Sequence, residues 1–293
     1  MPAPLHPAPA SRSVSIAGAA SLFAALSILG VACKAPTTPA GQGPTAAPEE
    51  SPSTDAPIGP ILQQSGDISL HALQGSPTYQ DASLTLVAPT TATVSGDAAF
   101  AFKVENFQLQ AQSSPIIDDA LASSDKGQHI HLVLNDQPYM AHYEDAFEVP
   151  LEPGRYRAVA FLSRSHHESV KSPGAFAVTQ FVVGDDASDA FDLAAPQIVY
   201  SRPKGTYAGA DADAVLLDFY ALNAPLAEDA YGVVVSVAGE QFTLRSWEPV
   251  LMTGLPEGQV EVRLQLVDRD GEPVPGPFND VTRTITVERK PNP

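Results

Sequence analysis

The segment LEPGRYRAVAFL at residues 151–162 recurs as LPEGQVEVRLQL at residues 255–266. Each copy opens with a proline and a glycine and continues with an apolar side chain at every second position. A period of two is typical of a β-strand, because successive side chains point to opposite faces of the sheet. The same turn and strand at two places in one chain indicate an internal repeat.

The repeat extends outward from this pair of strands. Upstream, the apolar positions of residues 130–134 align with Val233, Val235 and Val237, and residues 104–109 resemble residues 217–222. The remaining runs of Val, Leu, Phe and Thr, separated by turn residues, also predict strands, with one short helix within residues 116–123. The pattern therefore predicts an all-β fold of two tandem sandwiches. Each has about 100 residues, the size of an immunoglobulin-like domain.

The predicted boundaries follow composition. Domain 1 covers residues 64–190 and domain 2 covers residues 191–293, with the acidic segment 184–192 as the joint. Residues 33–63 are rich in Pro, Ala and Thr and are expected to form an extended linker.

The N-terminus predicts export. Arg12 precedes an uncharged run at residues 13–32, which ends at Cys33, the only cysteine. This order is typical of a secretory signal peptide, predicted at residues 1–32. Cys33 resembles the first mature residue of bacterial lipoproteins, although Gly30 stands where that family usually has Leu. The resemblance implies a diacylglycerol or palmitate anchor at Cys33 and a location in the bacterial cell envelope, at the outer membrane or facing the periplasm. A signal cut elsewhere, or an uncleaved anchor, is the alternative.

Charge excludes one class of partner. Thirty-four acidic residues against sixteen basic ones give a net charge of −18. Neutralisation of phosphates needs Lys and Arg, so nucleic-acid binding is not expected. No internal disulfide is expected from a single cysteine, and stability must come from buried apolar surface.

Two histidines in domain 1 suggest a metal site. His129 and His131 are two residues apart on a predicted strand and so share one face. Their equivalents in the second copy are Gly232 and Val234, so the fold itself does not require histidine there. Neutral imidazoles are preferred ligands of zinc and copper.

Further donors are predicted to join them. We expect hairpin pairing and the end of the next strand to add four residues: Met140, His142, His166 and His167. A Met among histidines suits copper, and zinc comes next. Metal affinity should fall as pH drops through the imidazole range. The alternative is that these are ordinary surface or loop histidines, with His129 and His131 hydrogen-bonded in the sheet.

Three basic residues are candidates for contact with an anion such as a phosphate or an acidic sugar: Arg164, Arg202 and Lys204. For Arg202 and Lys204, a contact with the acidic joint is the alternative. Motifs for a serine hydrolase, a zinc protease or a phosphate loop are missing from the sequence, so no enzymatic activity is expected. A cupin-like metalloenzyme remains a further alternative. His129, His131 and Asp136 faintly resemble the first cupin motif, but Arg157 stands where another histidine is wanted.

Three segments carry a broader resemblance: GQHIH at 127–131, SRSHHES at 163–169 and YSRPKG at 200–205. They resemble poorly characterised bacterial lipoproteins with two tandem immunoglobulin-like β-domains, a resemblance that implies no particular activity. The sequence therefore predicts a membrane-anchored, non-enzymatic envelope lipoprotein with a His-rich copper or zinc site in domain 1. An adhesion or scaffold module that binds an envelope protein or a glycan is the alternative.

Overall fold

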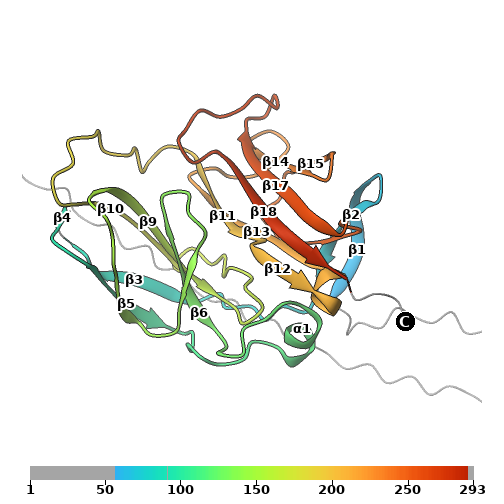
Figure 1. Ribbon diagram of the computed structural model, residues 1–293, viewed down its shortest axis with the longest axis horizontal. Coiled ribbons are helices and arrows are strands. Elements are labelled where there is room, and N and C mark those ends of the chain that lie inside the picture. Colours follow the sequence, from blue (N-terminus) through green and yellow to red (C-terminus); the bar gives the residue numbers. More distant parts are fainter. Residues whose placement is uncertain (1–56, 91, 290–293) are drawn as a thin grey trace, which may run out of the picture. The chain divides into compact units, whose positions relative to one another are not determined.

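A computed structural model describes residues 57–90 and 92–289, so the predicted signal peptide, Cys33 and most of the predicted linker lie outside the described residues. The first sandwich consists of two facing sheets (Figure 1). One has five strands in the order β4 (Thr93–Val94), β10 (Phe176–Val183), β9 (Gly154–Ser163), β6 (His129–Leu134) and β7 (Met140–His142). The other has three: β3 (Ser83–Ala88), β5 (Ala98–Glu105) and β8 (Ala146–Val149).

The second sandwich repeats this plan with two added strands. One sheet has the order β12 (Gly205–Ala208), β18 (Asp280–Glu288), β17 (Gly258–Val267), β14 (Gly232–Val237) and β15 (Glu240–Leu244). The facing sheet has the order β1 (Ile58–Ser65), β2 (Ile68–Leu73), β16 (Val250–Thr253), β13 (Val215–Leu222) and β11 (Gln197–Arg202). Two short helices complete the described chain: α1 (Pro115–Ala120) and the 3₁₀ helix η1 (Gly209–Ala212).

The topology confirms the tandem repeat. The order β4-β10-β9-β6-β7 matches β12-β18-β17-β14-β15, and β3-β5-β8 matches β11-β13-β16. β4 pairs parallel with β10, as β12 does with β18. A cis proline follows β3 at Pro89 and follows β11 at Pro203. The predicted all-β, immunoglobulin-like class is therefore confirmed, and β9 and β17 are the two strands from which the repeat was recognised.

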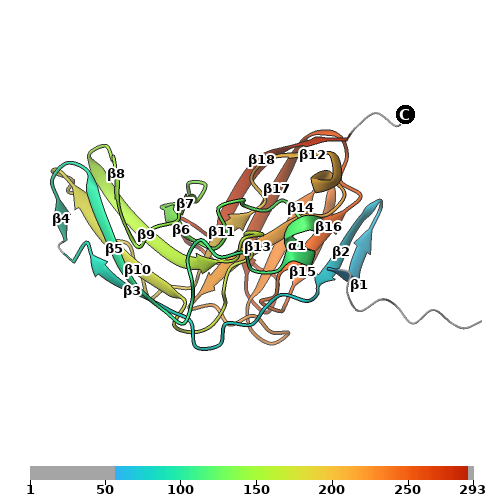
Figure 2. The ribbon, with the colours of Figure 1, turned by 90° about the horizontal axis from the view of Figure 1, so that it is seen from below.

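The first hairpin corrects the predicted boundaries. β2 pairs with β16, from Ala72 opposite Val250 to Ser69 opposite Thr253, and Figure 2 shows β1 and β2 beside β16. Residues 58–63 were expected in the linker and residues 64–73 in domain 1, but both lie in the second sandwich. Alternating apolar residues predict a strand but do not specify the sheet that receives it. Here the edge of β16 receives the hairpin.

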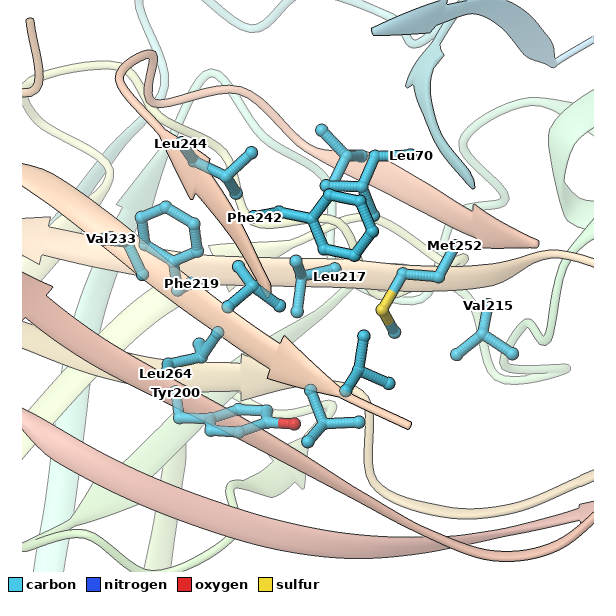
Figure 3. Close-up of a cluster of buried hydrophobic side chains, with 14 of the residues drawn as sticks. Leu70, Tyr200, Val215, Leu217, Phe219, Val233, Phe242, Leu244, Met252 and Leu264 are labelled. Carbon is cyan, nitrogen blue, oxygen red and sulfur yellow. The ribbon is translucent and has the colours of Figure 1, made fainter. Parts of the chain in front are cut away.

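The core of the second sandwich shows why the hairpin belongs there. Ile68 and Leu70 are buried, at 2% and 0% exposure, in the cluster that also contains Leu217, Phe242 and Met252. Figure 3 shows Leu70 among the side chains of this core. Burial of each such side chain contributes about 1.5–3 kcal/mol, so β2 is an integral part of the second sandwich.

Strand β6 is buried on both faces, and this places the candidate site. Its Ile130, Leu132 and Leu134 face the core of the first sandwich. Val133, on the opposite face, belongs to a second cluster with residues of both sandwiches: Tyr139, Val159, Phe161, Val199, Tyr220 and Leu222. His129 and His131 alternate with the core residues of β6 and so share the face of Val133. Among residues 57–90 and 92–289, no helix is both long and apolar enough to cross a membrane.

Candidate metal centre

Three imidazoles converge on one point in the structure. His129 and His131 come from β6, and His167 comes from the loop that follows β9. His129 Nε2 lies 2.9 Å from His131 Nε2 and 3.1 Å from His167 Nδ1. One nitrogen from each ring lies within 4.8 Å of the other two. The predicted pair on β6 is thus joined by one of the four further candidates.

The backbone of the loop after β9 directs His167 to this cluster. Arg164 N donates to Glu168 O at 2.9 Å, and His167 N donates to Arg164 O at 2.9 Å. Within this tight turn, His167 has a φ of 67°, a left-handed conformation that is uncommon for residues other than glycine. The turn gives His166 and His167 different partners, although they are neighbours in the sequence.

The outer ring nitrogens determine where the lone pairs point. His129 Nδ1 lies 2.8 Å from the carbonyl oxygen of Gly127, which only accepts, so Nδ1 carries the proton and Nε2 presents its lone pair. That single lone pair faces two other ring nitrogens, and it can accept only one good hydrogen bond. A metal ion bound by all three nitrogens relieves this conflict. A backbone carbonyl on the far ring nitrogen is also one of the common outer partners of a metal-binding histidine.

His131 has a similar outer partner on the second sandwich. Its Nδ1 lies 3.3 Å from Ser201 Oγ at the end of β11. Because Ser201 and His131 belong to different sandwiches, packing of the two sandwiches fixes the orientation of this ring.

Burial keeps the three imidazoles neutral. It lowers the pKa of His129 to about 4. Burial, followed by neighbouring imidazoles and the charges of Arg202 and Lys204, holds the pKa of His131 well below its usual value, and burial and the same two cations do so for His167. Near neutral pH each ring is therefore in the form that binds a metal ion.

Tyr139 is a neighbour of the cluster that sequence reasoning missed. Its ring stacks on His131 with centroids 3.5 Å apart, and its hydroxyl oxygen lies 3.3 Å from His167 Nδ1. The repeat aligned Tyr139 with the core residue Phe242, which explains the ring but not the hydroxyl. Phe242 has no hydroxyl, and this difference between the two copies was the sequence signal that could have indicated a role for Tyr139 beside the cluster.

Two of the predicted anion contacts lie beside Tyr139. Lys204 Nζ donates to the carbonyl of Tyr139 at 2.7 Å and lies 3.8 Å from the centre of its ring. Arg202 lies 5.7 Å from the same ring centre and donates to Tyr207 Oη at 2.9 Å. Lys204 therefore joins the two sandwiches through a carbonyl and an aromatic ring, not through the acidic joint.

Met140 and His142 are not part of the cluster, and their assignment to the site is corrected. In the β6–β7 register, Leu132 pairs with Met140 and Ile130 pairs with His142. Directly paired residues share a face, so both side chains lie on the side of the first core. The residue opposite His131 is Ala141. His142 instead stacks on Phe147, with ring centroids 3.4 Å apart.

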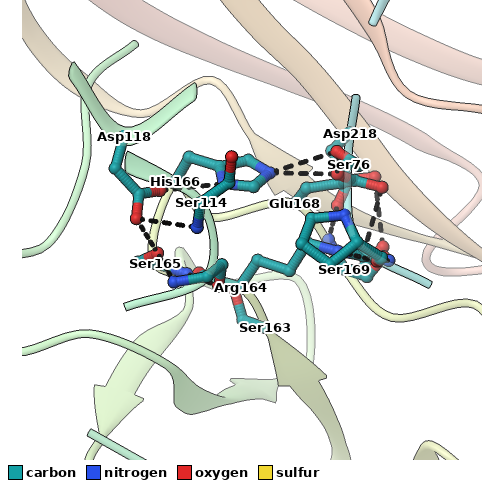
Figure 4. Close-up of polar contacts among 12 residues, drawn as sticks. Ser76, Ser114, Asp118, Ser163, Arg164, Ser165, His166, Glu168, Ser169 and Asp218 are labelled. Carbon is teal, nitrogen blue, oxygen red and sulfur yellow. Dashed lines mark hydrogen bonds and ion pairs between the residues drawn. The ribbon is translucent and has the colours of Figure 1, made fainter. Parts of the chain in front are cut away.

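His166 belongs to a separate buried network, shown in Figure 4. Its Nδ1 lies 3.1 Å from Asp118 Oδ1 and its Nε2 lies 3.0 Å from Glu168 Oε2. Burial would lower the pKa of His166, but the hydrogen bonds to Asp118 and Glu168 outweigh it and raise the pKa. Both ring nitrogens are occupied, so the prediction that His166 is a metal ligand is corrected.

Arg164 is also committed to this network rather than to an external anion. Its Nη1 lies 3.1 Å from Glu168 Oε1 and its Nε donates to Pro77 O at 3.0 Å. With Ser76, which donates to Glu168, the network attaches the segment before β3 and helix α1 to the loop that carries His167. The network therefore stabilises the contact of these segments with the loop, whereas the backbone turn directs His167.

The fold does not support the cupin-like alternative. His129 and His131 lie on the outer face of a two-sheet sandwich, where they meet the second sandwich, and not inside a barrel.

No family model matches this chain, and no curated protein matches it. Solved structures give distant similarities. Fibronectin(III)-like modules of Clostridium thermocellum CbhA are 14% identical over 70% of this chain and 94% of theirs, with a TM-score of 0.25. Bacteroides ovatus SGBP-B, solved with a mixed-linkage heptasaccharide, is 13% identical over 70% of this chain and 47% of its own, with a TM-score of 0.21. The central fibronectin-III array of RIM-binding protein is 12% identical over 75% and 65%, with a TM-score of 0.23.

Proposed function

We propose that this protein is a non-enzymatic, lipid-anchored binding module of a bacterial envelope, and that His129, His131 and His167 together hold one zinc or copper ion. The observation that carries the proposal is the convergence of three ring nitrogens. The lone pair of His129 Nε2 faces two other nitrogens and can satisfy only one of them.

The donor set supports a transition metal of the zinc and copper class. Imidazole suits zinc and copper, whereas thioether selects Cu(I). Met140 lies on the other face of the sheet, so its sulfur does not favour copper over zinc at this site. Zinc and copper are therefore equal candidates from the histidines alone.

Metal titration of the purified full chain tests the site. After removal of metal with a chelator, we expect one Zn(II) or one copper ion to bind per chain by calorimetry or by competition with a chromophoric chelator. The double change His129→Ala with His131→Ala, and separately His167→Asn, should abolish binding. Asn is chosen because it tolerates the left-handed backbone at position 167.

His142→Ala is the matched control, because His142 lies on the adjacent strand but on the other face. It should bind metal as the wild type does. Unchanged titration in the double variant would refute the site. A wild-type chain that binds no metal would instead favour an adhesion or scaffold module for an envelope protein or a glycan.

The anchor is tested separately, because Cys33 lies outside the described residues. Cells that express the wild type should incorporate labelled palmitate into the protein, and Cys33→Ser should not. Label retained in Cys33→Ser would show that the lipid, if any, is attached elsewhere and that this part of the proposal is wrong.

A further inference from the structure

The hydroxyl of Tyr139 places an oxygen donor beside one nitrogen of the histidine cluster. A tetrahedral site with bonds of about 2.0–2.1 Å separates neighbouring ligand atoms by about 3.3–3.4 Å. The hydroxyl oxygen of Tyr139 lies 3.3 Å from His167 Nδ1. The ring is 3% exposed and is held in place by stacking on His131 at an interplanar angle of 14°. Its oxygen is therefore already positioned beside the cluster.

The surroundings of Tyr139 contain two cations. Burial raises the pKa of the Tyr139 hydroxyl above its usual range, and the charge of Arg202 acts in the opposite direction. Lys204 lies 3.8 Å and Arg202 5.7 Å from the centre of the Tyr139 ring, whereas the three imidazoles are uncharged ligands. In residues 57–90 and 92–289, no carboxylate oxygen joins the histidine cluster. The nearby Asp218 is already paired with Lys171 Nζ at 2.5 Å. A divalent ion would add two positive charges to this buried site, which is costly unless a negative ligand offsets them.

We infer that the Tyr139 oxygen binds the metal as a phenolate, and that it makes the site selective for a divalent ion over Cu(I). This inference rests on the proposed metal site. When the metal–oxygen bond forms, the O–H bond of Tyr139 breaks and its proton leaves to solvent, so one proton is released per ion bound. An anionic oxygen suits Zn(II) and Cu(II), whereas Cu(I) prefers soft neutral or sulfur donors.

The experiment uses the purified full chain loaded with one equivalent of Cu(II). A bound phenolate gives a phenolate-to-copper charge-transfer band in the visible spectrum, which imidazole ligands alone do not give. We expect this band in the wild type. In Tyr139→Phe the band should disappear. Cu(II) and Zn(II) should also bind at least about tenfold more weakly, because removing even an outer partner of a metal ligand lowers metal affinity by about that factor. Affinity for Cu(I) should not change.

Tyr143→Phe is the matched control. The Tyr143 ring lies 5.1 Å from the His129 ring, but its hydroxyl is bonded to Ser124 Oγ at 2.6 Å, so this variant should keep the band. Stoichiometric Cu(II) without the band in the wild type would overturn the inference and leave the three-histidine site intact, as would a band that persists in Tyr139→Phe. If the wild type binds no Cu(II), both the inference and the proposed function fail. The stoichiometry, measured on the same sample, distinguishes these outcomes.

Discussion

His166→Gln should destabilise the fold without weakening metal binding, although His166 is next to a proposed ligand. The imidazole is 0% exposed and is hydrogen-bonded to Asp118 at 3.1 Å and to Glu168 at 3.0 Å. A neutral amide cannot replace both charge-assisted bonds, each of which contributes about 1.5–3 kcal/mol. Removing one partner of a buried ion pair costs roughly 3–5 kcal/mol. We therefore expect a loss of about 3–5 kcal/mol in the free energy of unfolding.

Urea unfolding of metal-free protein at neutral pH measures this loss, and the same preparation is then titrated with Zn(II). His167→Asn is the matched neighbour, and it should show the reverse pattern: unfolding free energy changed by less than about 1 kcal/mol, and no metal binding. If His166→Gln loses less than about 1 kcal/mol, or keeps its stability and loses metal, the separation of the two histidines into two networks is refuted.

Two further predictions concern the core and the other face of β6. Leu70 is 0% exposed in the second core, so Leu70→Ala should lower the free energy of unfolding by about 2–5 kcal/mol. Hydrogen exchange should speed up in β13 and β16 more than in β3 and β5, and the opposite ranking would contradict the placement of β2. Within the part of the chain that the structure describes, His142 Nε2 is buried and has no hydrogen-bond partner, and burial lowers the pKa of His142 from 6.5 to about 4. The unfolded chain therefore takes up this proton first, and wild-type stability falls as pH drops from about 6.5 to about 4. His142→Phe, which retains stacking on Phe147, should therefore gain in relative urea midpoint over that range, and a constant difference between pH 7 and pH 4.5 would count against this assignment.

The sequence predicted strands and their repetition well, because alternation and turn residues are local properties. It could not predict pairing. Ile68 and Leu70 mark a strand, but the open edge that receives it belongs to β16, about 180 residues later. Met140 and His142 have the same spacing as His129 and His131. Which face they occupy depends on register, and a shift of one residue would have reversed it.

In the candidate site, too, local spacing could be predicted from the sequence, whereas contacts between distant segments could not. His129 and His131 could be paired from their spacing on one strand. The neighbours His166 and His167 could not be told apart, because the left-handed backbone at His167 depends on a turn closed by hydrogen bonds to Arg164 and Glu168. Tyr139 was hidden by the repeat itself, since comparison with Phe242 accounts for a ring in a core and says nothing about a hydroxyl.

The β1–β2 hairpin also determines how the molecule responds to force. The described chain begins and ends in the second sandwich, with β1 and β18, and the whole first sandwich is inserted between β2 and β11. Tension applied between the two ends of the described chain acts directly on β1, which pairs with β2, and on β18, which pairs with β12 and β17. Until one of these end strands detaches, β6, β9 and the loop with His167 lie outside the load path.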